Sequence, residues 1–310
     1  MVSQFLKLIL IFVFLIRLGV AQEADSLDTN VQPATAVMDS HQASVLPPDT
    51  LSDIPIETTV SDTTSVDSQR QGNGLTNPGT VPVSFRKLPN HAFGVGEYLE
   101  FEIAFKFVTA GTAVMSIPDT VWIEGRPCYH IVTTAESNPF FSTFYKVEDR
   151  VESVIDMEGM FPWRFEKRIR EGRYKADRSV KYDQINHIVY GHKDTLTVQS
   201  YIQGVLSSFY YVRTLPLKVG SYIDIDNYGD GKVYPLRVYV LGKEKVSVPA
   251  GKFNCIVIEP VLRTEGIFNQ KGRLKIWITD DERRIPVIMK SKILVGSIDC
   301  RLTKIGNNNP

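Results

Sequence analysis

The amino-acid sequence predicts a mainly β protein, with strongly curved antiparallel sheets built from two duplicated halves and one amphipathic helix packed against them. Three features of the 310-residue chain predict this fold class. A segment of eight residues occurs twice, apolar and polar residues alternate along many runs, and one segment has the apolar spacing of a helix.

The duplicated segment begins at Val95 as VGEYLEFE and at Val219 as VGSYIDID, 124 residues later. A period of this length is typical of duplicated half-domains, because solenoid repeats span only about 20 to 50 residues. We therefore expect two related halves at about 93–186 and 217–310, joined by a helical connector.

Alternation with a period of two begins after residue 85. Apolar side chains occupy every second position of the first run, at Leu99, Phe101, Ile103, Phe105 and Phe107. This pattern is typical of a strand with one buried face. Further runs of the same kind, separated by turn residues, follow in both halves, so the duplicated β domain is expected over 85–310.

One segment between the halves has helical periodicity. Its apolar residues lie three or four positions apart, at Val198, Ile202, Val205, Leu206, Phe209 and Val212. This spacing forms one apolar stripe along about four turns. An amphipathic helix among strands buries its stripe on a sheet, so we expect it to cover or plug one open side of the curved sheet. The shorter segment 137–141 is expected to do the same in the first half.

The first 21 residues have the pattern of a secretory signal. Lys7 precedes an apolar run, and small residues end the segment at Ala21, after which cleavage is expected. The alternative is a membrane helix, but Arg17 interrupts the run before it reaches the 18 or so apolar residues that a span needs. We therefore expect an exported protein of the periplasm or cell envelope of a Gram-negative-type bacterium, without a transmembrane helix after cleavage.

Residues 22–84 are predicted to form a disordered acidic linker. They carry nine acidic residues, one arginine and no aromatic residue, so they bury too little apolar surface to offset chain entropy. Because the formal net charge of the chain is zero, the folded part is mildly basic. Such a surface is either simply solvated or attracted to an anionic membrane surface, sugar or phosphate. The basic residues do not form clusters with interleaved aromatics, so nucleic acid is not expected as a partner.

The cysteines Cys128, Cys255 and Cys300 have neither the CxxC nor the Cys/His spacing of a metal site. Cys128 and Cys255 lie in β-like runs, where a buried thiol packs as a small hydrophobic group. Three free buried thiols are expected, with a disulfide between Cys255 and Cys300 as the alternative.

Two acidic segments resemble chemical sites without completing one. The segment 224–231 has the carboxylates and glycine that begin a calcium loop, but Pro235 stands where a bidentate Glu belongs, so we expect a hairpin turn. The charged run 280–284 is expected to be a solvated turn with internal ion pairs. The histidines are scattered, and no catalytic residue, metal site or cofactor is expected.

Aromatic residues are concentrated in the first half and in the predicted helix. Most are expected in the core, and the others in the wall of an apolar cavity that a curved sheet encloses. The candidate ligand-binding residues are Phe101, Phe105, Trp163, Phe165, Phe209 and Tyr210.

Several motifs resemble the domain-of-unknown-function 3108 (DUF3108) family of exported bacterial proteins. They are GVGEYLEF at 94–101, FFSTFYKVED at 140–149, LSSFYYVR at 206–213, PAGKFNC at 249–255 and IWITDD at 276–281. The resemblance extends over about 88–304 and implies an exported protein without an established activity or known catalytic residues.

The function that we predict is a non-enzymatic envelope binding module, which holds a lipid-like or amphipathic ligand on a concave apolar face. The alternative is a structural or assembly protein that engages an envelope protein through a sheet face or edge. A third class is a hydrolase of an envelope polymer. A continuous apolar cavity favours the first class, a filled core the second, and a polar cleft with converging carboxylates the third.

Removal of residues 22–84 is expected to leave the thermal unfolding midpoint of the remaining chain nearly unchanged, because a disordered acidic segment makes no core contacts. Calorimetry on the full and shortened chains measures this. A fall of more than about 4 °C would show that the segment packs on the domain.

Overall fold

The computed structural model describes residues 84–105, 108–229, 231–262, 274–293 and 296–307. The predicted signal peptide and all but the last residue of the predicted linker lie outside the described residues. Among the helices that are described, none is long and apolar enough to cross a membrane.

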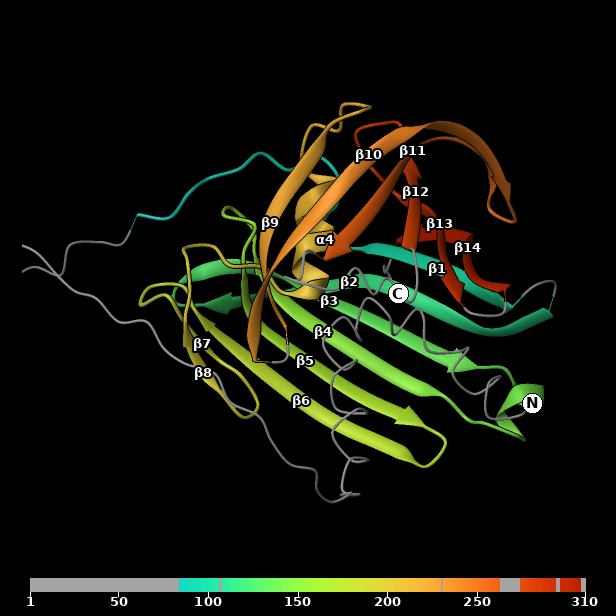
Figure 1. Cartoon of the computed structure of the whole chain (residues 1–310), viewed down its shortest axis with the longest axis horizontal. Helices are drawn as coiled ribbons and strands as arrows, with labels where there is room; N and C mark the ends of the chain where they lie inside the picture. Colours follow the sequence, from blue (N-terminus) through green and yellow to red (C-terminus); the bar gives the residue numbers. More distant parts are fainter. Residues whose placement is uncertain (1–83, 106–107, 230, 263–273, 294–295, 308–310) are drawn as a thin grey trace, which may run out of the picture. The chain divides into compact units, whose positions relative to one another are not determined.

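The described chain forms one antiparallel sheet of fourteen strands and two helices, which confirms the prediction of a mainly β fold (Figure 1). The strands are β1 (Glu97–Phe105), β2 (Val108–Ile123), β3 (Arg126–Ser137), β4 (Glu148–Asp156), β5 (Pro162–Glu171), β6 (Tyr174–Asp183), β7 (Ile188–Tyr190), β8 (Thr195–Thr197), β9 (Tyr222–Gly229), β10 (Lys232–Val248), β11 (Gly251–Leu262), β12 (Leu274–Thr279), β13 (Pro286–Ile293) and β14 (Gly296–Asn307). Their order across the sheet is β8-β7-β6-β5-β4-β3-β2-β1-β14-β13-β12-β11-β10-β9. Within the described residues, no ladder joins β8 to β9, so the sheet is not closed.

Single contacts nevertheless bring the two ends of the sheet together. Gln203, in the connection after β8, forms an isolated parallel bridge with Asn227 of β9. Tyr228 of β9 donates its hydroxyl hydrogen to Asp194, just before β8, over 2.6 Å. One backbone bridge and one side-chain hydrogen bond therefore connect the terminal strands where a ladder does not.

The strands fall into two successive runs of six, β1 to β6 and β9 to β14. Corresponding strands begin about 124 residues apart, as β5 at Pro162 and β13 at Pro286 show. Irregular pairing follows the same offset, since the β2/β3 register shifts after Ser116 and the β10/β11 register after Val240. Bulges of this kind bend and twist strands. These agreements are consistent with the duplication and the strong curvature, which both remain predictions.

Helix α4 (Val205–Arg213) is shorter than the helix that the sequence predicts. The residues predicted to form the first turn of the helix make other backbone hydrogen bonds instead. The N–H of Val198, for example, donates to the carbonyl of His187. Gly204 is extended at φ −105° and ψ 177° and forms the N-cap, so the helix begins after it. The apolar spacing upstream still buries Ile202, but in irregular backbone.

Helix α3 (Pro139–Ser142) lies where the sequence predicts a second cover for the sheet, but it covers nothing. None of its residues is buried, and Phe140 is 66% exposed. The Asn138 side chain caps it by accepting a hydrogen bond from the N–H of Phe141 at 2.9 Å. A helix of one turn is too short to bury an apolar stripe, so this prediction is wrong.

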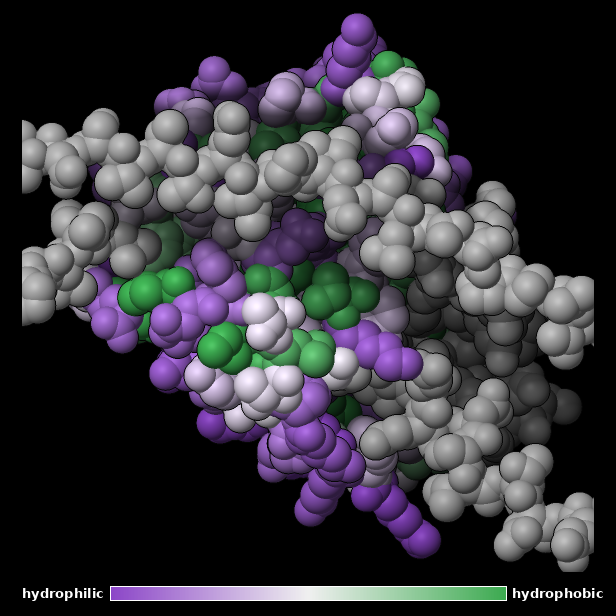
Figure 2. Space-filling view, turned by 60° about the vertical axis from the view of Figure 1, so that its left-hand side comes forward, coloured by the Kyte–Doolittle hydropathy of each residue, from purple (hydrophilic) through white to green (hydrophobic). Residues whose placement is uncertain are grey.

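The core extends through both runs of strands and includes one face of α4. Leu206, Phe209 and Val212 of the helix join a cluster with buried side chains from β1 to β6 and from β9 to β14. Figure 1 shows α4 between strands β9 to β11 and strands β2 to β4, and the helix contacts both β4 and β9. Figure 2 shows that hydrophobic residues also gather on one outer face, among hydrophilic ones. The helix therefore connects the two runs of strands through its buried stripe.

Arg213, the last residue of α4, carries a fully buried charge. Its guanidinium donates two hydrogen bonds to the Glu97 carboxylate, of 2.8 and 2.7 Å, and further bonds to the carbonyls of Ala92 and Arg283. Burial lowers the pKa of Arg213, but the Glu97 carboxylate outweighs that effect, so the pKa is raised and the side chain stays charged. One residue thus joins the helix to β1 and to the turn before β13.

Replacement of Arg213 by Met is expected to lower the free energy of unfolding by about 3–5 kcal/mol, because it leaves the Glu97 carboxylate without its partner. Urea unfolding measures the change. Lys243→Met is the control, since the Lys243 side chain is 59% exposed in its pair with Asp280 and surface pairs contribute about 0–1 kcal/mol. Equal losses in the two variants would contradict the structural role of Arg213.

Candidate functional site

An apolar depression lies between α4 and the strands β9 to β12. The space in it that atoms do not fill is about 440 Å³, a figure that includes the mouth open to solvent. The enclosed part is only about 30 Å³, well below the volume of about 300–1,000 Å³ of a typical small-molecule site. Its walls are formed by Val205, Ser208, Phe209, Val212, Asn227, Leu236, Ile258, Pro260, Leu262 and Ile276. The depression is therefore a shallow apolar groove, whose composition suits an apolar group that lies partly in its open mouth.

Two polar residues interrupt this apolar wall. The Ser208 hydroxyl donates to the carbonyl of Val205 in its own helix, over 2.8 Å, and keeps lone pairs that can accept. Asn227 is 4% exposed and lines the depression from β9. An amide in such a position can donate to or accept from a polar group of a ligand.

The local backbone places Asn227 next to the helix. The N–H of Gln203 donates to Asp226, and the N–H of Tyr228 donates back to Gln203, so this stretch of β9 runs beside the residues that lead into α4. At the start of the helix, a Cβ atom on Gly204 would clash with the Tyr182 hydroxyl. Glycine is therefore required where the chain turns into the helix against the sheet.

The structure separates the six predicted ligand-binding residues. Phe209 lines the depression. Phe101, Phe105 and Tyr210 belong to the same core cluster but do not line it. Phe165 is partly buried at the junction of two clusters. Trp163 lies in a third cluster, with Phe161, Val154 and Cys128. Binding by any of the six remains a prediction.

The sequence analysis does not identify the aliphatic wall, which comes from the second half of the chain. Leu236 lies in an alternating run of β10, and Ile258 ends a run of four consecutive buried residues of β11. In the sequence, these residues differ from other strand residues by nothing except their apolar, inward-facing positions. Every strand of the sheet has such positions. Asn227 has a weak signal of its own, as a polar residue at an inward position of β9.

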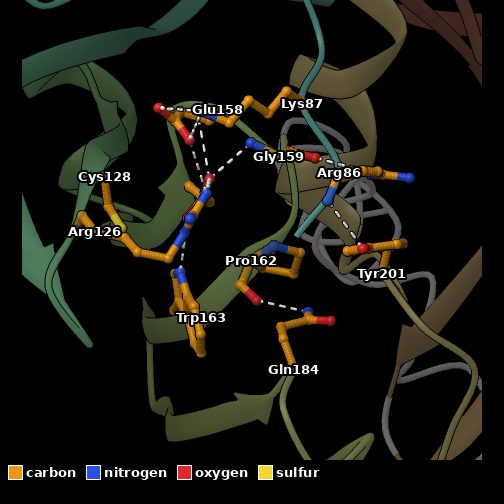
Figure 3. A network of polar contacts seen from close by, with 11 residues as sticks. Arg86, Lys87, Arg126, Cys128, Glu158, Gly159, Pro162, Trp163, Gln184 and Tyr201 are labelled. Carbon is orange, nitrogen blue, oxygen red and sulfur yellow. Dashed lines mark hydrogen bonds and ion pairs between the residues drawn. The ribbon is translucent and has the colours of Figure 1, made fainter. Parts of the chain in front are cut away.

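A buried carboxylate organises the turn between β4 and β5. Asp156 accepts two hydrogen bonds from Arg126, of 2.5 and 2.8 Å, and others from the N–H groups of Glu158 and Gly159. Figure 3 shows the Arg126 side chain between Glu158 and Trp163. Burial raises the pKa of Asp156, but the bonds from Arg126 and Gly159 outweigh it, so the pKa is lowered. This turn thus has a charged cluster of its own, which the sequence analysis does not predict.

The same turn is tied to the segment that leads into α4. Arg86 donates to the carbonyls of Gly159 and Met160. Its guanidinium lies 4.4 Å from the ring centre of Tyr201 and 5.0 Å from that of Tyr211, the latter in α4. Cation–π contacts of this kind stabilise a partly buried arginine. The network therefore holds one side of the helix, as Arg213 holds its end.

The remaining candidate groups have structural roles. The run 280–284 forms the expected ion-paired turn, with Asp280 near Lys243 and Arg284, and 224–231 spans the expected β9–β10 hairpin. All three cysteines are free and buried, and burial raises the pKa of Cys128 and Cys255 to about 12, so both are inert thiols at neutral pH. In the described part of the chain, no group of three or more His, Cys, Asp or Glu side chains could hold a metal ion.

Replacement of Asp156 by Asn is expected to cost about 3 kcal/mol of stability at pH 7, because Arg126 loses a buried charged partner. The pKa of Asp156 is below its unfolded value of about 3.9. The stability it confers is present above that value and is lost as the pH falls through the folded pKa. Urea unfolding should therefore show a constant difference between pH 6 and pH 8 that shrinks below about pH 4. A difference that is equal at pH 3 and pH 7 would contradict this assignment.

Several solved structures are similar to this chain. One is a β-barrel-like protein of the domain of unknown function DUF1849 from Brucella abortus, with a TM-score of 0.47 and 10% identity, covering 73% of this chain and 100% of that one. Another is a "putative exported protein with YmcC-like fold" from Bacteroides fragilis, with a TM-score of 0.33 and 11% identity over 72% and 99% of the chains. A "putative lipoprotein" from Parabacteroides distasonis has a TM-score of 0.32 and 8% identity over 72% and 100%.

No curated protein matches the chain. A family model, described as "Protein of unknown function (DUF3108)", matches residues 100–303, which is most of the folded part. This confirms the resemblance carried by the sequence motifs. The chain belongs to the DUF3108 family.

Proposed function

We propose that this protein is an exported, non-enzymatic binding module that holds a lipid-like or amphipathic ligand in the depression beside α4. The observation that carries the proposal is the composition of that depression, in which aliphatic walls surround one buried amide, Asn227. A wall of this kind favours an acyl chain, because burial of apolar surface contributes about 25 cal/mol per Å².

The amide specifies the other part of the ligand. An amide in an apolar wall is stabilised by a hydrogen bond, which a ligand with a polar group can supply. Asn227 can donate to a carboxyl or ester oxygen, and Ser208 beside it can accept from a hydroxyl. A chain with one polar group near its end, such as a fatty acid or an acylated compound, satisfies both features.

Two further proposals belong to this function. Export is supported by the sequence of the first 21 residues, with its apolar run and its small residues before the cleavage point. Duplication and strong curvature are supported by the two runs of six strands and by register shifts that recur about 124 residues apart. A sheet bent around α4 would enclose the helix and leave the depression as its opening.

The test is the uptake of dansyl-undecanoic acid and of a panel of fluorescent fatty acids of increasing chain length. Leu262→Trp is expected to fill the rim of the depression and weaken binding by about tenfold, or about 1.4 kcal/mol. Phe209→Asp should abolish binding, because a carboxylate in an apolar wall costs several kcal/mol. Asn227→Leu should weaken the binding of fatty acids and of their methyl esters, but not that of a hydrocarbon probe without a polar group.

The matched control is Leu241→Trp, which makes the same change at a residue of β10 that is 42% exposed and outside the depression. Circular dichroism on each variant separates lost binding from lost folding. The proposal is wrong if the wild-type protein takes up no probe of the panel, or if Leu262→Trp binds as well as Leu241→Trp.

A further inference from the structure

A second feature lies away from the depression, at the end of the sheet that carries α3. Four exposed apolar or aromatic side chains form what we term the aromatic tip: Val108 (54% exposed), Phe140 (66%), Phe144 (71%) and Tyr174 (42%). The rings of Phe140 and Phe144 are in edge contact, with centres 5.6 Å apart. Contiguous exposed rings of this kind indicate an interaction surface and not scattered surface residues.

Hydrogen bonds hold the parts of the tip in place. Asn138 donates through its side chain to Thr109 and through its backbone to Ala110, which fixes α3 beside the start of β2. The N–H of Gly172 donates to Lys146 over 2.8 Å, which fixes the β5–β6 turn beside the residues after α3. Figure 1 shows α3 at an end of β3 and β4. The rings are thus exposed on an ordered framework.

The surroundings of the tip carry unpaired positive charge. Arg173 and Lys175 flank Tyr174 at the β5–β6 turn, and neither has an ion pair among the described residues. Lys146 and Arg170 are neutralised by Glu148 and Asp177. One exposed acid, Glu136, also lies nearby on β3. Glu171, opposite Tyr174, is buried, so the excess of one cation applies to the exposed side chains beside the rings.

We propose that the aromatic tip docks on the surface of a lipid bilayer that contains anionic lipids. The rings enter the interfacial region, while Arg173 and Lys175 contact the headgroups. A bilayer accommodates isolated protruding rings, whereas a protein partner requires a complementary pocket for each. This surface is independent of the depression, so either proposal can fail without the other.

The test is flotation of the protein with vesicles of phosphatidylcholine containing about one third phosphatidylglycerol. The protein is purified from the soluble fraction after export, so that all variants share one N-terminus. Phe140→Ser with Phe144→Ser is expected to weaken binding at least tenfold, since each ring loses its burial in the interface. Arg173→Ser with Lys175→Ser should weaken it about fivefold per cation, and only with the anionic vesicles.

Trp122→Ser is the matched control, because Trp122 is 69% exposed at the opposite end of β2, about 45 Å from Val108 along the strand. It should bind vesicles as the wild type does. In addition, brominated lipids should quench the tryptophan fluorescence of a Phe144→Trp variant. The proposal is overturned if the wild type does not float, if Trp122→Ser loses as much binding as the Phe variant, or if the Phe variant changes only the oligomeric state in size-exclusion chromatography.

Discussion

The buried ion pair between Arg213 and Glu97 is the interaction on which the position of α4 depends. A buried guanidinium needs acceptors, and here Glu97 and two backbone carbonyls accept from its two terminal nitrogens, while Nε has no partner among the described residues. The rings of Phe93 and Tyr210 lie about 5 Å from its centre and complete its surroundings. Because the partners come from distant parts of the chain, the pair fixes the helix end to the first run of strands and to the turn that precedes β13.

Carboxylates stabilise the corresponding turns of both runs in a similar way. Asp156 accepts from the backbone N–H groups of the β4–β5 turn, and Asp281 accepts from those of Arg283 and Arg284 before β13. The burial and the ion pairs of these carboxylates differ between the two runs. Asp156 is fully buried and bound to Arg126, whereas the second turn is solvated and its ion pairs are partly exposed. The first turn therefore has a buried carboxylate, whose network extends through Arg86 to α4. The second turn reaches α4 through its backbone, since the carbonyl of Arg283 accepts from Arg213.

The two proposed functional surfaces differ in their physical basis. The depression is concave and aliphatic with one buried amide, so its ligand is chosen by shape and by a single hydrogen bond. The aromatic tip is exposed and flanked by cations, so it suits a deformable partner that accepts rings and offers negative charge. A protein with both could meet its ligand at a membrane surface, since lipid-like compounds are scarce in water. Neither surface requires a catalytic group.

Local signals in the sequence predicted the strands, the β9–β10 and 280–284 turns, the buried thiols and the family, because each depends on local periodicity, local turn chemistry or motif order. The sequence analysis overestimated the length of α4. The spacing that marks an amphipathic helix also fits residues buried in irregular backbone, as at Ile202. Only the tertiary structure decided that Phe209 and Asn227 meet at one depression, that Trp163 lies elsewhere, and that Arg213 reaches Glu97. Contacts between residues far apart along the chain leave no periodic signal, because the sheet order that creates them is set by the fold as a whole.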